Sequence, residues 1–123
     1  VDNSKKNSDI NNAGIIASAV QTALADWQGE GGSLDKIGAS MTATVKGKTM
    51  SAKFDANTLK VGSKNKTLQA CIFEVIPAME FPEAKYQKLD ATGNDFSITI
   101  YGTGKVEVKC KASEEAASPA SGS

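Results

Sequence analysis

The sequence contains no histidine and no arginine among its 123 residues. Histidine is the side chain best suited to acid–base catalysis near neutral pH, and it is also the most common metal ligand. Arginine supplies the bidentate contacts to phosphates and bases that nucleic-acid-binding proteins favour. The 14 basic residues are all lysines, and 14 acidic residues balance them. We therefore expect no enzyme, no cofactor or metal site, and no dedicated nucleic-acid binding.

Two further scarcities limit the fold class. Aromatic residues make up only 6% of the chain, so the core has to be built mainly from aliphatic side chains. No run of 18 or more apolar residues is present, and nothing here predicts a transmembrane helix. The length suits a single domain that folds without metals or many disulfides. The chain begins without methionine or a recognisable signal peptide, so we expect a processed or truncated protein.

The most informative segment is residues 8–28, where apolar residues recur at intervals of three or four and polar residues occupy the opposite side. This spacing predicts one amphipathic helix of roughly 30 Å. Gly29, Gly31 and Gly32 follow it and are expected to end it. The side chains predicted to pack the helix onto a sheet are Ile10, Ala13, Ile16, Val20, Leu24 and Trp27.

Two pairs of alternating segments predict two β-hairpins. Residues 41–45 and 50–54 are joined by a short turn containing glycine, and residues 95–101 and 106–110 are joined by Gly-Thr-Gly. The predicted sheet core comprises Met41, Val45, Met50, Phe54, Phe96, Ile98, Ile100, Val106 and Val108. Because the helix and the strands each have one apolar face, we expect an α+β fold in which the long N-terminal helix packs on a small antiparallel sheet.

The remaining segments give weaker signals. Residues 55–66 are polar and are expected to form a loop. Residues 67–76 fit a short helix capped by Thr67 or a buried strand, and we favour the helix. The tail 112–123 has no apolar periodicity and is predicted to be disordered, so the globular domain is expected to span residues 1–111.

Cys71 and Cys110 are the only cysteines, and their spacing matches neither a zinc site nor a redox motif. They form either a disulfide, which would stabilise the fold by about 4 kcal/mol, or two buried thiols. We favour the disulfide if the protein is extracytoplasmic. The oxygen side chains of residues 90–95 could ligate calcium, but a turn stabilised by aspartate or asparagine is far more common in such a loop.

The segment KKNSDINNAGIIASAVQTALADW resembles the second half of the long spine helix of type IV pilins and pilin-like proteins. Ile76-Pro77 and the final hairpin FSITIYGTGKVEVKC are similar to the small pilin-like proteins of Gram-positive bacteria. The family's processing site and its apolar half-helix are not in this sequence. The resemblance therefore implies a soluble domain that has been separated from its membrane-inserting segment.

The resemblance implies a structural subunit of a pilus or related filament at the bacterial cell surface. Its partners would be copies of itself, other pilins and the assembly machinery, and only the missing segment would contact a membrane. Adhesion, twitching motility, DNA uptake and secretion are all roles open to such a subunit. The alternative is a secreted or surface module that binds carbohydrate or protein without forming a filament. A small enzyme that uses only lysine or carboxylates is a weaker third possibility.

Overall fold

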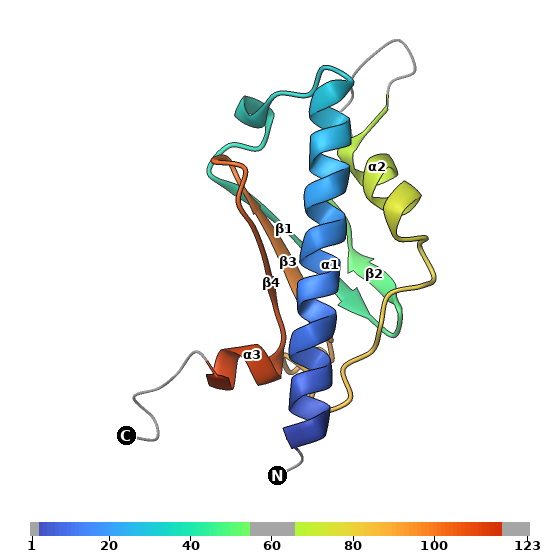
Figure 1. Ribbon diagram of the computed structural model, residues 1–123, viewed down its shortest axis with the longest axis vertical. Coiled ribbons are helices and arrows are strands. Elements are labelled where there is room, and N and C mark those ends of the chain that lie inside the picture. The colour runs from blue at the N-terminus through green and yellow to red at the C-terminus, as the bar shows by residue number, and fades with distance from the viewer. Residues whose placement is uncertain (1–2, 55–65, 117–123) are drawn as a thin grey trace.

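A computed structural model describes residues 3–54 and 66–116. It has an α+β fold, as predicted, with one long N-terminal helix and a four-stranded antiparallel sheet (Figure 1). In chain order the elements are α1 (Asn3–Gly29), the short 3-10 helix η1 (Leu34–Lys36), β1 (Ser40–Lys46), β2 (Thr49–Ala52), α2 (Leu68–Val75), β3 (Phe96–Tyr101), β4 (Val106–Lys109) and α3 (Lys111–Ala116).

The sheet consists of the two predicted hairpins joined side by side, in the order β2-β1-β3-β4. Strands β1 and β3 form its centre, with Ser40 opposite Tyr101 at one end and Val45 opposite Phe96 at the other. A bulge interrupts the pairing of β1 with β2. Beyond this bulge Ala52 is exposed, although it alternates with the buried Met50 and Phe54 in the segment 50–54.

Glycine is required at two of the turns. Gly47 and Lys48 join β1 to β2 with φ angles of 60° and 74°, the left-handed pair typical of a tight hairpin turn. Gly102, after β3, lies so close to the connector before β1 that a Cβ there would sit 2.0 Å from the Gly38 carbonyl oxygen. This close approach ties the second hairpin to the segment that follows α1.

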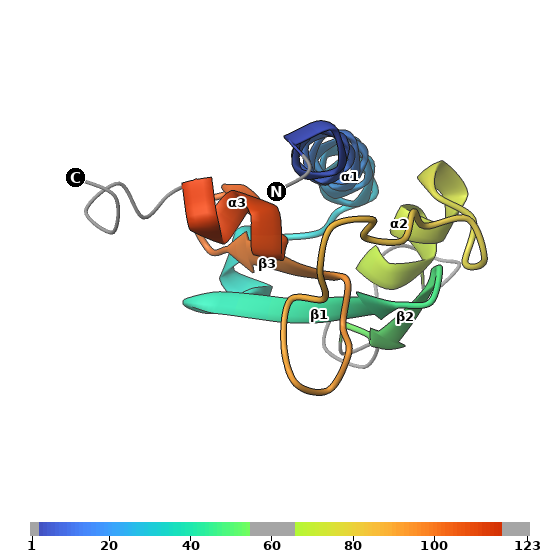
Figure 2. The ribbon, with the colours of Figure 1, turned by 90° about the horizontal axis from the view of Figure 1, so that it is seen from below.

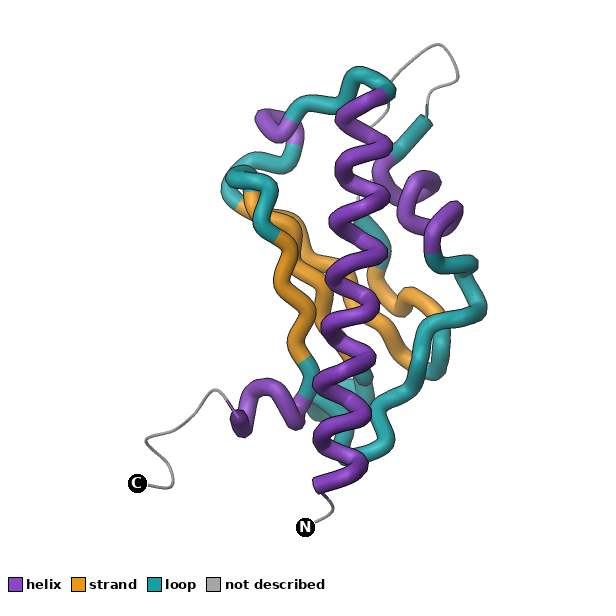
Figure 3. Tube along the Cα trace, in the orientation of Figure 1, coloured by secondary structure: helices purple, strands orange, loops and turns teal. Residues whose placement is uncertain are grey.

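Helix α1 lies along one face of the sheet, with α2 beside it, and the opposite sheet face is turned away from both helices (Figures 2 and 3). The buried side chains of α1 are Asp9, Ala13, Ile16, Val20, Ala23, Leu24 and Trp27. Trp27 is completely buried, and Gly32 packs directly against its ring. The helix also begins earlier than predicted, at Asn3.

The prediction that Ile10 packs on the sheet is wrong, because Ile10 is 38% exposed. The line of buried positions on a 3.6-residue helix passes through Ala13 and continues to Asp9, one residue before Ile10. Asp9 is completely buried and occupies the core-facing position that the sequence pattern predicts for Ile10.

The predicted sheet core lies between the sheet and the helices. Met41 and Val108 are half-buried and pack against the core. The other seven predicted residues are fully buried, namely Val45, Met50, Phe54, Phe96, Ile98, Ile100 and Val106.

Residues 68–75 form the short helix that the sequence favoured over a strand. Thr67 caps it by accepting a hydrogen bond from the Ala70 N–H at 3.0 Å. Its Leu68 and Ile72 side chains are buried. The predicted loop at 55–66 lies, except for Lys66, outside the described residues.

The prediction of disorder from residue 112 onward is wrong for residues 112–116. These residues belong to α3, which buries Ala112. In its first turn the Ser113 hydroxyl accepts a hydrogen bond from the Cys110 N–H and donates one to the Cys110 carbonyl oxygen. A six-residue helix with one buried side chain leaves no periodic signal in the sequence. The ordered chain therefore extends past residue 111, and residues 117–123 lie outside the described part.

Candidate functional site

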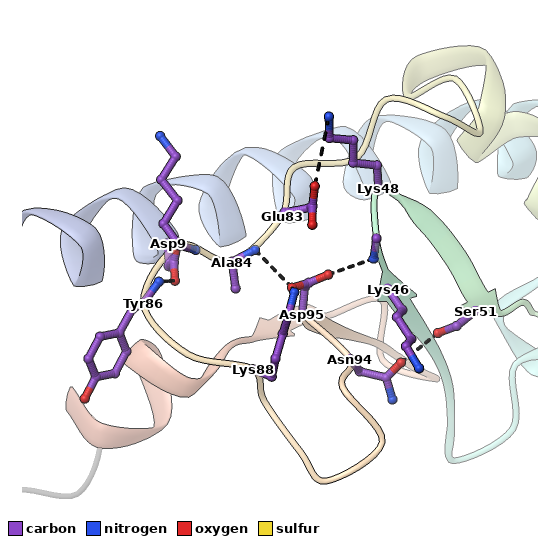
Figure 4. Close-up of polar contacts among 12 residues, drawn as sticks. Asp9, Lys46, Lys48, Ser51, Glu83, Ala84, Tyr86, Lys88, Asn94 and Asp95 are labelled. Atoms are coloured by element: carbon purple, nitrogen blue, oxygen red, sulfur yellow. Dashed lines mark hydrogen bonds and ion pairs between the residues drawn. The ribbon is translucent and has the colours of Figure 1, made fainter.

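The candidate site is α1 itself, which has a buried face that fixes it to the domain and an opposite face left open. Two carboxylates, Asp9 and Asp95, hold the long loop between α2 and β3 beside the N-terminal half of α1 (Figure 4). Asp9 of α1 accepts hydrogen bonds from the backbone N–H groups of Lys85 at 2.8 Å and Tyr86 at 2.9 Å. This buried carboxylate therefore joins the helix directly to the loop.

The second carboxylate, Asp95, joins the same loop to the sheet. It is completely buried and accepts hydrogen bonds from the N–H groups of Gly47 at 2.9 Å and Ala84 at 3.1 Å. It also accepts a hydrogen bond from the ammonium group of Lys88 at 2.5 Å, and this contact raises the pKa of Lys88. Two backbone donors and one cation thus compensate the buried charge.

A third polar cluster joins the start of α1 to α3. The Lys6 ammonium lies 2.9 Å from the Glu115 carboxylate and 4.8 Å from the centre of the Tyr86 ring. The Tyr86 hydroxyl donates a hydrogen bond to the same carboxylate at 2.9 Å. These contacts raise the pKa of Lys6 and lower the pKa of Glu115. The cluster brings together residues from α1, the loop and the C-terminal helix.

The face of α1 that points away from the sheet combines small and apolar residues. Ile15 is 56% exposed and Ile10 is 38% exposed, and on the helix surface Gly14 lies between them. A Cβ added at Gly14 would meet nothing within 4 Å, so the helix backbone is open to approach there. Asn11 and Ser18, on the same face, are also exposed.

The two cysteines are free buried thiols, so the favoured disulfide is contradicted. Cys71 lies in α2 beside the C-terminal half of α1, near Asp26 and Glu30. Cys110 directly precedes α3, which contacts the N-terminal end of α1 through Lys6 (Figure 1). The two thiols are thus placed toward opposite ends of the helix. Burial raises the pKa of the Cys71 thiol.

The loop at residues 90–95 is built as the turn that the sequence favoured. The Asp90 carboxylate accepts hydrogen bonds from the N–H groups of Thr92 and Asn94, both at 3.1 Å, and from their side chains. These donors lower the pKa of Asp90 to about 2. Asp95 points to Gly47 and Ala84 instead, so the two carboxylates do not converge on one point.

Sequence reasoning missed Asp9, which takes a central place in the site. Its signal was present, because Asp9 lies four residues before Ala13 and therefore in line with the buried stripe. Within residues 3–54 and 66–116, no cluster of three histidine, cysteine, aspartate or glutamate side chains is arranged to hold a metal ion. In the same part of the chain, no helix combines the length and the hydropathy needed to cross a membrane.

Comparison with known proteins identifies no match, whether among protein families, curated proteins or solved structures.

Proposed function

We propose that this chain is the head of a structural subunit of a type IV pilus or a related filament. The observation that carries the proposal is the open face of α1, where Ile10 and Ile15 flank the bare backbone at Gly14. Single exposed apolar residues are normal on a soluble protein. Two of them beside an exposed glycine, on a helix that runs the length of the domain, fit a surface that packs against another helix.

The way α1 is held also supports the proposal. A filament subunit transmits load between its head and its spine, so the helix has to be joined firmly to the head. Here Asp9 joins it to the loop, Lys6 joins it to α3, and Trp27 is buried at its other end. These attachments are distributed along the helix and leave its outer face unoccupied by any other described element (Figure 2).

The proposal assigns the chain no catalytic activity and places it at the bacterial cell surface. Its partners would be further copies of the chain, other pilins and the assembly machinery. Membrane contact would be restricted to an apolar segment upstream of these residues, which the proposal requires. The resemblance of residues 5–27 to the pilin spine helix and the α+β arrangement are consistent with this assignment.

The coding sequence upstream of Val1 tests the proposal. We expect a processing site followed by about 20 predominantly apolar residues that continue α1 without a helix-breaking segment. Antibodies raised against this domain should then label filaments on intact cells in electron micrographs. An ordinary cleaved signal peptide directly before the domain, or labelling without filaments, would contradict the proposal and favour a surface binding module.

A further inference from the structure

Three large apolar side chains remain exposed in the part of the chain that the structure describes, namely Ile10, Ile15 and Met79. Ile10 and Ile15 lie on the open face of α1, whereas Met79 belongs to the segment that follows α2 and is 72% exposed. Residues 77–80 turn back at the flank of the molecule beyond α2 and do not cover α1 (Figures 1 and 2). The domain therefore has two separate exposed apolar surfaces that it does not bury against each other.

Met79 is carried by a turn whose backbone is fixed at both ends. The Glu80 N–H donates a hydrogen bond to the Pro77 carbonyl oxygen at 2.9 Å, which closes the turn. On one side of the turn Ile76 packs against the core, and on the other side Phe81 is buried. Because the turn is held in this way, its backbone loses little conformational entropy when a partner binds the exposed side chain.

The open face of α1 carries no charge along most of its length. Between Asn7 and Ala25 the only charged residue of α1 is Asp9, which is buried, although charged residues make up 23% of the chain. Charged side chains border this stretch at Lys5, Lys6, Asp26 and, on the adjacent loop, Lys85. Solvent exposure alone does not require such an exclusion, since lysine and glutamate are both good helix formers. The face is therefore better matched to an apolar partner than to a charged ligand.

We propose that the turn at residues 77–80 of one copy packs on the open face of α1 of a neighbouring copy. This inference rests on the proposed function and names the surface that meets α1, which is the end of α2 with its turn and not a second α1. At Gly14 the missing side chain leaves a gap between Ile10 and Ile15. Met79 is unbranched and adaptable, as a side chain that fills such a gap has to be. Glu80 beside it is exposed and stays at the rim of the contact, where polar residues are usual.

The positions of the two surfaces suit a contact that repeats along a filament. In Figure 1 the turn lies level with the middle of α1, and Figure 2 shows that it projects to the side of the molecule and not over the helix. A neighbour that is rotated about the direction of α1, with its own α1 parallel, therefore brings its turn to the open face. Because the contact joins two different surfaces, each copy keeps one of each for the next copy, which is the head-to-tail arrangement that builds open filaments.

Cysteine cross-linking in filaments of the full-length protein, sheared from its own cells, tests the proposal. Asn11→Cys places a thiol one helical turn from Gly14 on the exposed side of α1, and Met79→Cys places a thiol on the turn. Mild oxidation of filaments with both substitutions should give a ladder of cross-linked copies on a non-reducing gel, and each single variant should give none. The native Cys71 and Cys110 are buried and should not react.

The matched control combines Met79→Cys with Thr22→Cys, an exposed position about 16 Å further along α1 than Asn11, and should give no ladder. Substitution of Met79 alone gives a second test that needs no cross-linking. Met79→Asp should abolish filaments and leave the melting temperature of the isolated domain unchanged, because the side chain is exposed. Met79→Leu keeps the apolar contact and should keep the filaments.

The outcomes separate this proposal from the filament proposal. Normal filaments with Met79→Asp, or filaments that carry both cysteines and give no ladder, would overturn the contact and leave the filament standing. Cross-linking that stops at dimers would also overturn it, since that result indicates a closed pair. So would cross-linking by Asn11→Cys alone, which indicates that one α1 packs on another. Wild-type cells without filaments would overturn both proposals.

Discussion

The C-terminal half of α1 is held to the domain by apolar packing, whereas its N-terminal half is held mainly by hydrogen bonds and ion pairs. In the C-terminal half Val20, Leu24 and Trp27 are buried among the strands and α2. In the N-terminal half, before Ile16, the buried positions are Asp9 and the small Ala13, and Lys6 pairs with Glu115. The two halves of one helix should therefore respond differently to substitution, salt and pH.

This difference bears on the proposed role of α1 as the link between a head and a filament. Apolar packing is non-directional and changes little with ionic strength. Charged hydrogen bonds fix one geometry, and the exposed ones weaken as salt screens them. The C-terminal half thus anchors the helix, while the N-terminal half sets how the loop and α3 are arranged around it.

The largest expected effect is at Trp27. Trp27→Ala removes the largest buried side chain and leaves a cavity beside Gly32, which should lower the free energy of unfolding by about 3–5 kcal/mol. Urea unfolding followed by circular dichroism measures this loss. Thr22→Ala, on the exposed side of the same helix, should change stability by no more than about 0.5 kcal/mol. If Trp27→Ala lowered the free energy of unfolding by less than Asp9→Ala, the result would contradict the division of α1 into a half held by apolar packing and a half held by polar contacts.

The next effect is at Asp9. Asp9→Ala leaves the N–H groups of Lys85 and Tyr86 without the buried carboxylate that accepts their hydrogen bonds, at a cost of about 2 kcal/mol. Amide hydrogen exchange at these two residues should accelerate more than exchange in β1 or β3, because the loop is released before the sheet opens. Asp26→Ala is the matched control, since Asp26 is an exposed aspartate on the same helix. Equal loop exchange in the two variants would show that Asp9 does not hold the loop.

A smaller effect is expected at Glu115. Glu115→Gln weakens the ion pair with Lys6, and the resulting destabilisation should be less than that of Asp9→Ala and should shrink with added salt. The pKa of Glu115 is lowered in the folded protein. The pair therefore stabilises the fold above the unfolded pKa of this group, and the stabilisation is lost as the pH falls through the folded value. Thermal melts from pH 7 to pH 3 measure this, and a wild-type/variant difference that does not narrow at low pH would contradict it.

The smallest effect is expected at Asp90, an exposed carboxylate that accepts several hydrogen bonds. Asp90 should titrate at about 2 in the folded protein, as measured by NMR of its side-chain carboxyl carbon. Its contribution to stability is present above the unfolded pKa near 3.8 and is lost as the pH falls through about 2. Combining Thr92→Val with Asn94→Ala removes side-chain donors and should raise this pKa toward its usual range. An unchanged pKa in the double variant would show that these donors are not its cause.

The same contrast explains how much the sequence could predict. The C-terminal half of α1 and both hairpins were predictable because apolar periodicity records which side chains face the core. The spacing of Asp9 from Ala13 indicates that Asp9 is buried, but the hydrogen bonds of its carboxylate could not be predicted. Its partners Lys85 and Tyr86 lie 76 and 77 positions away and contribute only backbone N–H groups, which no side-chain pattern marks.

The outward face of the central strands shows a related limit. Alternation predicted that Thr42, Thr44, Ser97 and Thr99 face away from the core, but not that they are neighbours. That depends on the pairing of β1 with β3, which brings together residues more than fifty positions apart. In the same way, the spacing of Cys71 and Cys110 left the disulfide open, and only their placement toward opposite ends of α1 decides against it.

The central claim, that the open face of α1 mediates assembly, is tested most directly by filament formation of the full-length protein in its own cells. Ile15→Asp places a charge on this face without touching the core, so we expect filaments to disappear from electron micrographs while the isolated domain keeps its melting temperature. Thr103→Asp, in the exposed turn between β3 and β4, should leave filaments intact. Normal filaments from the Ile15→Asp protein would contradict the account.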